Sequence, residues 1–167
     1  MAKVTKFEEL KCWKASRILV NYVFDLFELP ELKTDYTLKN QLERAALSVM
    51  NNIAEGFGRY HRPEFIRFLN LSASSCCEVK SMSYILHDRK KIDNSTLNIF
   101  QTKIEKPYAL TLGLIRYLKE KEVVKKNEKK EDVLVSSSKK TKTKTSKAAK
   151  RNSPSKNSNS ITNDVNT

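Results

Sequence analysis

Glycine is scarce in this sequence, which contains only three glycines among 167 residues. Gly56, Gly58 and Gly113 cannot build the glycine-rich loops that hold phosphates in Walker and dinucleotide-binding sites. Nucleotide-driven enzymes of those two classes are therefore excluded. The sequence also lacks a run of about 18 uncharged apolar residues, which a membrane-spanning helix requires, and its first residues lack the apolar segment of a signal peptide. We expect a soluble, cytoplasmic protein.

Cysteine and histidine are also few. The three cysteines include an adjacent pair but no C-x-x-C, which argues against a thiolate zinc site and against a disulfide framework. His61 and His87 are too far apart to form the i, i+4 pair of a helical metal site. Glu55 has no second acid at a fixed spacing, so a buried ion pair with an arginine of a neighbouring helix or subunit is favoured over catalysis. We predict no enzyme activity, no cofactor and no metal. A nuclease that uses the two histidines as acid and base is the alternative.

Positive charge is in excess, and it is concentrated toward the C-terminus. The chain carries 32 Lys and Arg against 19 Asp and Glu, a formal net charge of +13. Residues 1–122 hold 20 basic and 15 acidic side chains, whereas residues 123–167 hold 12 basic and 4 acidic ones. The second segment has no aromatic residue and cannot bury enough apolar surface to offset the entropy of ordering it. We predict a folded domain over residues 1–122 and a disordered Lys/Ser/Thr-rich tail over residues 123–167.

Two N-terminal segments, at about residues 12–27 and 38–57, show apolar residues at helical spacing. The first is apolar over a wide arc, and Leu29-Pro30 is predicted to end it because proline disfavours helical geometry in the residue before it. A bundle needs only one stripe from each helix, so the wide arc indicates an oligomeric interface. The second helix is predicted to begin at the N-cap candidate Thr37. Gly56 and Gly58 suit a left-handed residue at its end.

Two further segments follow the same spacing. The third helix is predicted from Arg62, with Pro63 at its first position, to about Lys91. The fourth is capped by Asn94 or Ser95, and Pro107 is expected to kink it or break it in two. Short connections join the four helices. They predict an all-α fold, an antiparallel up-down four-helix bundle that carries the disordered basic tail.

Basic residues gather between the second and third predicted helices. Arg59, Tyr60 and Arg62 lie in this connection, and Arg67 follows along the third helix. Arginines and an aromatic ring beside a helix N-terminus form a place for a phosphate and a stacked base. The alternative is structural, because Arg59 compensates the dipole of a helix end and Arg67 can pair with Glu64 at i, i+3.

The tail offers a second cationic surface. Its densest lysines are Lys139, Lys140, Lys142 and Lys144. Each phosphate that a lysine neutralises releases condensed counterions, so such a segment binds nucleic-acid backbones without reading their sequence. The alternative is a tail that only increases solubility.

Three stretches resemble a known family. They are Phe7-Glu8-Glu9-Leu10 followed by Trp13-Lys14, the run NIAEGFGR at residues 52–59, and the run EFIRFL at residues 64–69. Over about residues 7–120 the chain resembles the four-helix bundle proteins of the 23S rRNA intervening-sequence family. The resemblance implies a small bacterial bundle that forms a homopentamer. It also implies a fold similar to the accessory variability determinant of diversity-generating retroelements, a basic pentamer that binds nucleic acid and a reverse transcriptase.

Two positions depart from this pattern. Relatives carry two consecutive basic residues in the second helix, where this chain has Glu43-Arg44, and Met50 stands where proline is common. Charge and resemblance together predict a non-enzymatic oligomer that binds nucleic acid, with RNA favoured, through the phosphate backbone. Arg44 joins the connection's arginines and the tail lysines as a candidate contact. The alternative is a protein-interaction scaffold, or an accessory subunit for a partner such as a reverse transcriptase.

Overall fold

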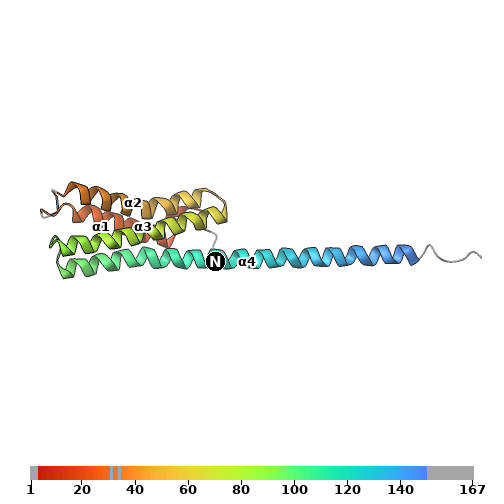
Figure 1. Cartoon of the computed structure of the whole chain (residues 1–167). Coiled ribbons are helices and arrows are strands. Elements are labelled where there is room, and N and C mark those ends of the chain that lie inside the picture. The colour runs from red at the N-terminus through yellow and green to blue at the C-terminus, as the bar shows by residue number, and fades with distance from the viewer. Residues whose placement is uncertain (1–3, 31, 34, 150–167) are drawn as a thin grey trace, which may run out of the picture. The chain divides into compact units, whose positions relative to one another are not determined.

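Four α-helices build the chain, and no strand occurs in the part that the computed structural model describes, residues 4–30, 32–33 and 35–149 (Figure 1). The elements are a 3₁₀ turn η1 (Phe7–Glu9), α1 (Lys11–Leu26), α2 (Tyr36–Gly58), α3 (Arg62–Asp88) and α4 (Asn94–Ala149). Up to Glu122 the helices alternate in direction and pack side by side (Figure 1). The predicted all-α class and antiparallel four-helix bundle are therefore confirmed. No helix among the described residues is long and apolar enough to cross a membrane.

The first connection begins earlier than predicted. Helix α1 ends at Leu26, three residues before Leu29, because the N–H groups of the next residues bond to carbonyls three positions back; Leu29 N–H, for example, donates to Leu26 O at 3.2 Å. Helix α2 starts at Tyr36, and its N-cap is Asp35 rather than Thr37. The Asp35 Oδ1 atom accepts from the N–H of Leu38 at 3.4 Å.

Helix α3 starts at Arg62 with a proline in its first turn, as predicted, but it ends at Asp88. Lys90 has a left-handed φ of 56°, and the N–H of Lys91 donates back to Leu86 O at 2.9 Å, which terminates the helix before the predicted Lys91. Asp93 caps α4, since its Oδ1 accepts from the N–H of Thr96 at 2.7 Å.

Pro107 does not break the fourth helix. It lies inside α4 and is buried in the bundle. Side-chain contacts hold this helix to both of its neighbours. The Tyr22 and Phe100 rings lie 5.3 Å apart between α1 and α4, and Lys80 Nζ is 3.1 Å from Glu105 Oε1 between α3 and α4.

The core has two apolar clusters. The larger includes Phe27, Leu42 and Phe100, and the smaller includes Leu10 and Ile53 next to η1. Three fully buried hydroxyl residues lie between them along their helices: Ser16, Ser72 and Thr111. The first two hydroxyls donate to backbone carbonyls, of Cys12 and Val49, at 2.8 Å each. Such bonds offset the cost of burying a polar group.

The wide apolar arc of the first helix is mostly used inside the monomer. Val20 is buried within this helix and Phe27 just after it, whereas Ile18 and Phe24 are exposed. The oligomeric interface that this arc indicates stays a prediction.

The chain divides into two compact units after Glu122, where its charge composition changes. Helix α4 continues past this residue to Ala149, so residues 123–149 have helical backbone in a segment whose composition predicts disorder. Residues 150–167 lie outside the described residues. The disorder of the tail stays a prediction.

Candidate nucleic-acid interface

The connection between α2 and α3 consists of three residues, Arg59, Tyr60 and His61. The left-handed residue here is Tyr60, with φ of 53°, and neither Gly56 nor Gly58 has a positive φ. Both glycines lie within α2, so their predicted role as left-handed terminators is wrong.

Gly56 has a packing role instead. A Cβ atom placed on it would lie 2.5 Å from the Cβ of Phe68 and 3.0 Å from a ring carbon of Phe65. The first distance is too short for a real Cβ contact, and the second is tighter than most, so a larger residue would force α2 and α3 apart. Gly56 therefore allows the two helices to approach closely at this end of the bundle.

Phe68 lies at the centre of a charged cluster that we call the corner clasp: Phe68 with Glu55, Arg59, Glu64 and Arg67. The Phe68 side chain is only 6% exposed. The guanidinium carbon of Arg59 lies 5.3 Å from the centre of its ring, and that of Arg67 lies 4.4 Å from it. Both distances allow cation–π attraction. The clasp ties the last turn of α2 to the first turns of α3.

Carboxylates neutralise both arginines of the corner clasp. Arg59 bonds to Glu55 one turn earlier in α2, and Arg67 Nη2 lies 3.1 Å from Glu64 Oε2. The hydrogen bond from Arg67 lowers the pKa of Glu64 below its ordinary value. Exposed pairs of this kind contribute little stability, yet they reduce the positive charge that the corner presents. Glu55 is exposed, and its partner is on its own helix, so the buried interhelical pair predicted for it is wrong.

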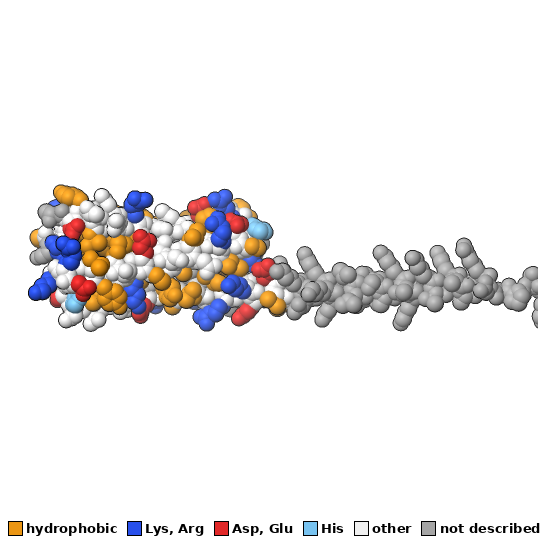
Figure 2. Space-filling model, in the orientation of Figure 1, with side chains coloured by type: hydrophobic (Ala, Val, Ile, Leu, Met, Phe, Trp, Pro, Cys, Tyr) orange, Lys and Arg blue, Asp and Glu red, His pale blue; other side chains and the backbone are white. Residues whose placement is uncertain are grey.

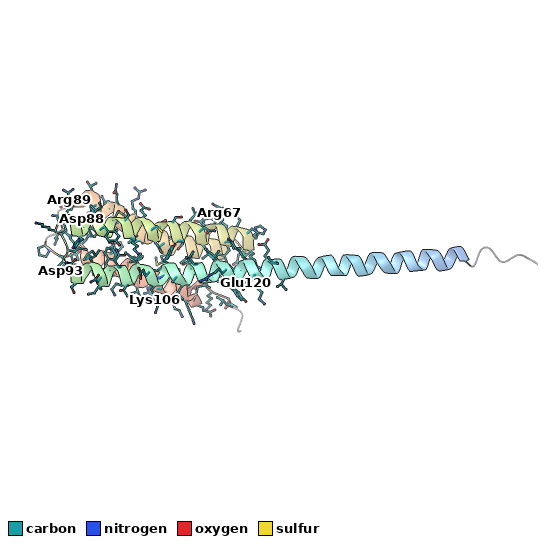
Figure 3. All side chains as sticks on the ribbon, turned by 60° about the horizontal axis from the view of Figure 1, so that its bottom comes forward. Arg67, Asp88, Arg89, Asp93, Lys106 and Glu120 are labelled. Carbon is teal, nitrogen blue, oxygen red and sulfur yellow. The ribbon has the colours of Figure 1, made fainter. Side chains whose placement is uncertain are left out.

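Arg62 and Tyr60 remain outside the clasp. Arg62 is half-buried at the start of α3, and its guanidinium makes no ion pair or hydrogen bond with any residue that the structure describes. Figure 2 shows basic and acidic side chains next to each other at the right-hand end of the bundle. Figure 3 places Arg67 near one end and Asp88, Arg89 and Asp93 at the opposite end.

The other predicted contacts lie elsewhere. Arg44 is exposed on α2, 15 residues before Arg59, which corresponds to about 22 Å along the helix axis. It lines a polar groove of about 440 Å³ between α2 and α3, together with Gln41, Ser48 and Glu78. The structure thus separates Arg44 from the corner. Lys139, Lys140, Lys142 and Lys144 belong to the helical backbone of α4, and their side chains lie outside the described part.

Few side chains among the described residues are arranged for catalysis or for metal binding. No three His, Cys, Asp or Glu side chains there converge on a metal position. His61 and His87 lie at opposite ends of α3. Burial raises the pKa of Cys12 to about 11 and that of Cys76 to about 12, so both remain neutral thiols at physiological pH. Cys77 is exposed.

Sequence reasoning found the arginines but missed Phe68. The available signal was a glycine inside a well-patterned helix, opposite an aromatic residue in the first turns of the next helix. A glycine in such a place indicates close packing.

The fold and the corner define the class of protein: a small all-α bundle whose second and third helices meet at a clasp of arginine, glutamate and phenylalanine. The family model of the 23S rRNA-intervening sequence protein matches residues 8–111. The chain belongs to this family, and the matched region contains the whole corner clasp and Tyr60.

The solved structures that share the fold include a protein of unknown function from the S23 ribosomal protein family of Bacteroides thetaiotaomicron. It is 20% identical in sequence to this chain, with a TM-score of 0.59. The alignment covers 63% of this chain and 95% of that one. No curated protein matches the chain.

Proposed function

We propose that this protein is a non-enzymatic, cytoplasmic nucleic-acid-binding bundle of bacterial origin, with RNA as the favoured polymer. It binds the phosphate backbone, and it works as an oligomer, a pentamer by family resemblance. The observation that supports the proposal most directly is the distribution of charge. Residues 123–167 carry 12 basic and 4 acidic side chains, whereas residues 1–122 carry 20 basic and 15 acidic ones.

The charge balance predicts different contributions to binding from residues 1–122 and from residues 123–167. Two of the corner's arginines are already paired with glutamates, so the corner adds little net positive charge. The tail lysines have no comparable number of acids nearby in sequence. Most of the electrostatic affinity therefore comes from residues 123–167, and this part of the affinity falls as salt rises.

The test is a salt titration of RNA binding. Fluorescence anisotropy of a labelled single-stranded RNA is measured with the full chain and with a variant that carries Lys139→Gln, Lys140→Gln, Lys142→Gln and Lys144→Gln. Each lost phosphate contact flattens the slope of log K against log salt by about 0.7, so the variant should bind more weakly and its slope should fall by up to about 3.

The matched control replaces the same four lysines by arginine, which keeps the charge and should keep the slope. An unchanged slope in the glutamine variant would remove these lysines from the mechanism. A wild-type protein that fails to bind RNA at about 50 mM salt, where phosphate contacts are strong, would overturn the proposed function.

A further inference from the structure

Tyr60 is the most exposed large apolar side chain in the part of the chain that the structure describes. It is 95% exposed, and Tyr36 follows at 70%. The Tyr60 ring makes no hydrogen bond, ring contact or cation contact with a described residue. It therefore contributes nothing to the packing of the bundle.

The backbone conformation at Tyr60 is unfavourable for a residue with a large side chain. Its φ of 53° lies in the left-handed region, which glycine adopts freely and bulky residues seldom adopt. Lys90 has the same geometry at the connection between α3 and α4, with φ of 56°. These two connections thus each have a long side chain at a position where glycine would be less strained. At Tyr60 that side chain is an aromatic ring exposed to solvent.

The neighbours of Tyr60 suit a nucleic-acid strand. Arg62, two residues on, has a guanidinium without a carboxylate partner among the described residues. Arg59 and Arg67 are exposed as well, although each is paired. An exposed aromatic ring beside guanidinium groups is the combination that stacks a base while cations contact the adjoining phosphates.

We propose that Tyr60 is a stacking platform for an unpaired base, so that the corner selects single strands and loops over duplexes. This inference rests on the proposed function. In a duplex both faces of a base are covered by its neighbours, and only an unpaired base can lie on the ring. Because tyrosine is neutral, its contribution does not depend on counterion release and is independent of the salt effect of the tail.

The experiment compares two RNAs with the same total number of nucleotides, an unstructured single strand and a blunt-ended duplex without a loop, by anisotropy with the full chain. Tyr60→Ala should weaken binding of the unstructured RNA about tenfold, and it should leave both the duplex affinity and the salt slope unchanged. Tyr60→Phe retains the ring and should bind like wild type. Tyr36→Ala removes an exposed tyrosine at the opposite end of α2 and serves as the control.

Two results would overturn the inference while the proposed function stands. Either Tyr60→Ala binds the unstructured RNA as tightly as wild type, or the substitution lowers the affinity for both RNAs equally. A wild-type chain that binds neither RNA overturns the proposed function and this inference with it. Thermal melting of each variant shows that it is folded, which the exposure of the ring predicts for Tyr60→Ala.

Discussion

At the scale of single residues, Gly56 determines how closely α2 and α3 approach. Gly56→Ala should destabilise the bundle by about 1–3 kcal/mol, the usual cost of overpacking. The new Cβ would meet the Cβ of Phe68 at 2.5 Å, and neither atom can rotate away because both are bonded directly to the backbone. Urea unfolding followed by circular dichroism measures the loss.

Gly58 provides the matched control two residues later. It lies in the last turn of α2, and a Cβ on it would meet nothing within 4 Å. Gly58→Ala should therefore be neutral or stabilise by up to about 1 kcal/mol, because alanine favours the helix. A Gly56→Ala variant as stable as Gly58→Ala would show that close contact at Phe68 is not required.

These two glycines also show what a local pattern can resolve. Their position near a helix end correctly placed the end of α2, but local propensity cannot distinguish a glycine needed for its backbone from one needed for its size. The distinction depends on Phe68, which the chain brings back only after the next helix has begun. By contrast, the Arg67–Glu64 pair was predictable, since it depends only on spacing within one helix.

At the scale of helices, Asp93 determines where α4 begins. Hydrogen bonds that Thr96 donates to the Asp93 carboxylate lower the pKa of Asp93 below its ordinary value. A lowered native pKa means that the charged cap stabilises the fold above the pKa of the unfolded chain, near 3.9, and that this stabilisation is lost as pH falls through the native value.

Asp93→Asn should therefore lower the urea midpoint at pH 7, because asparagine keeps an acceptor at the cap but has no charge. The difference from wild type should shrink as pH falls from about 4, the pKa of the unfolded chain, through the lower native pKa of Asp93, where the wild-type carboxylate becomes protonated. Asp25→Asn, at an exposed position of α1, controls for the loss of one charge. A difference that stays constant over this pH range would contradict a role for the charge.

The helices themselves follow from their apolar stripes, but their ends depend on competition between neighbouring caps. Asp35 is used in place of Thr37, and Asp93 in place of Asn94 or Ser95. In both cases an aspartate just upstream captures the first free N–H groups. Of the two effects predicted for Pro107, a kink or a break into two helices, the break is wrong, because α4 continues through it. Its ring is buried in the bundle, and that packing offsets the lost hydrogen bond.

At the scale of the whole molecule, the core and the charge belong to different parts of the chain. Among the described side chains, which extend to Val124, the last buried one is Ile115. Composition alone predicts a boundary at residue 122, because the balance of charged and apolar residue types changes there. The corner's three-dimensional arrangement was not accessible in that way, because it brings together residues from two helices.

A chain of residues 1–122 should therefore fold by itself. Its melting temperature should lie within about 2 °C of that of the full chain, because truncation removes no described core residue. A drop of more than about 5 °C would show that residues 123–167 contact the bundle.

Circular dichroism spectra of the full chain and of residues 1–122 report on the backbone of the tail. Since residues 123–149 are helical in the structure, the full chain should have more helical ellipticity per molecule than residues 1–122. Equal ellipticity would instead support the disorder that the composition predicts.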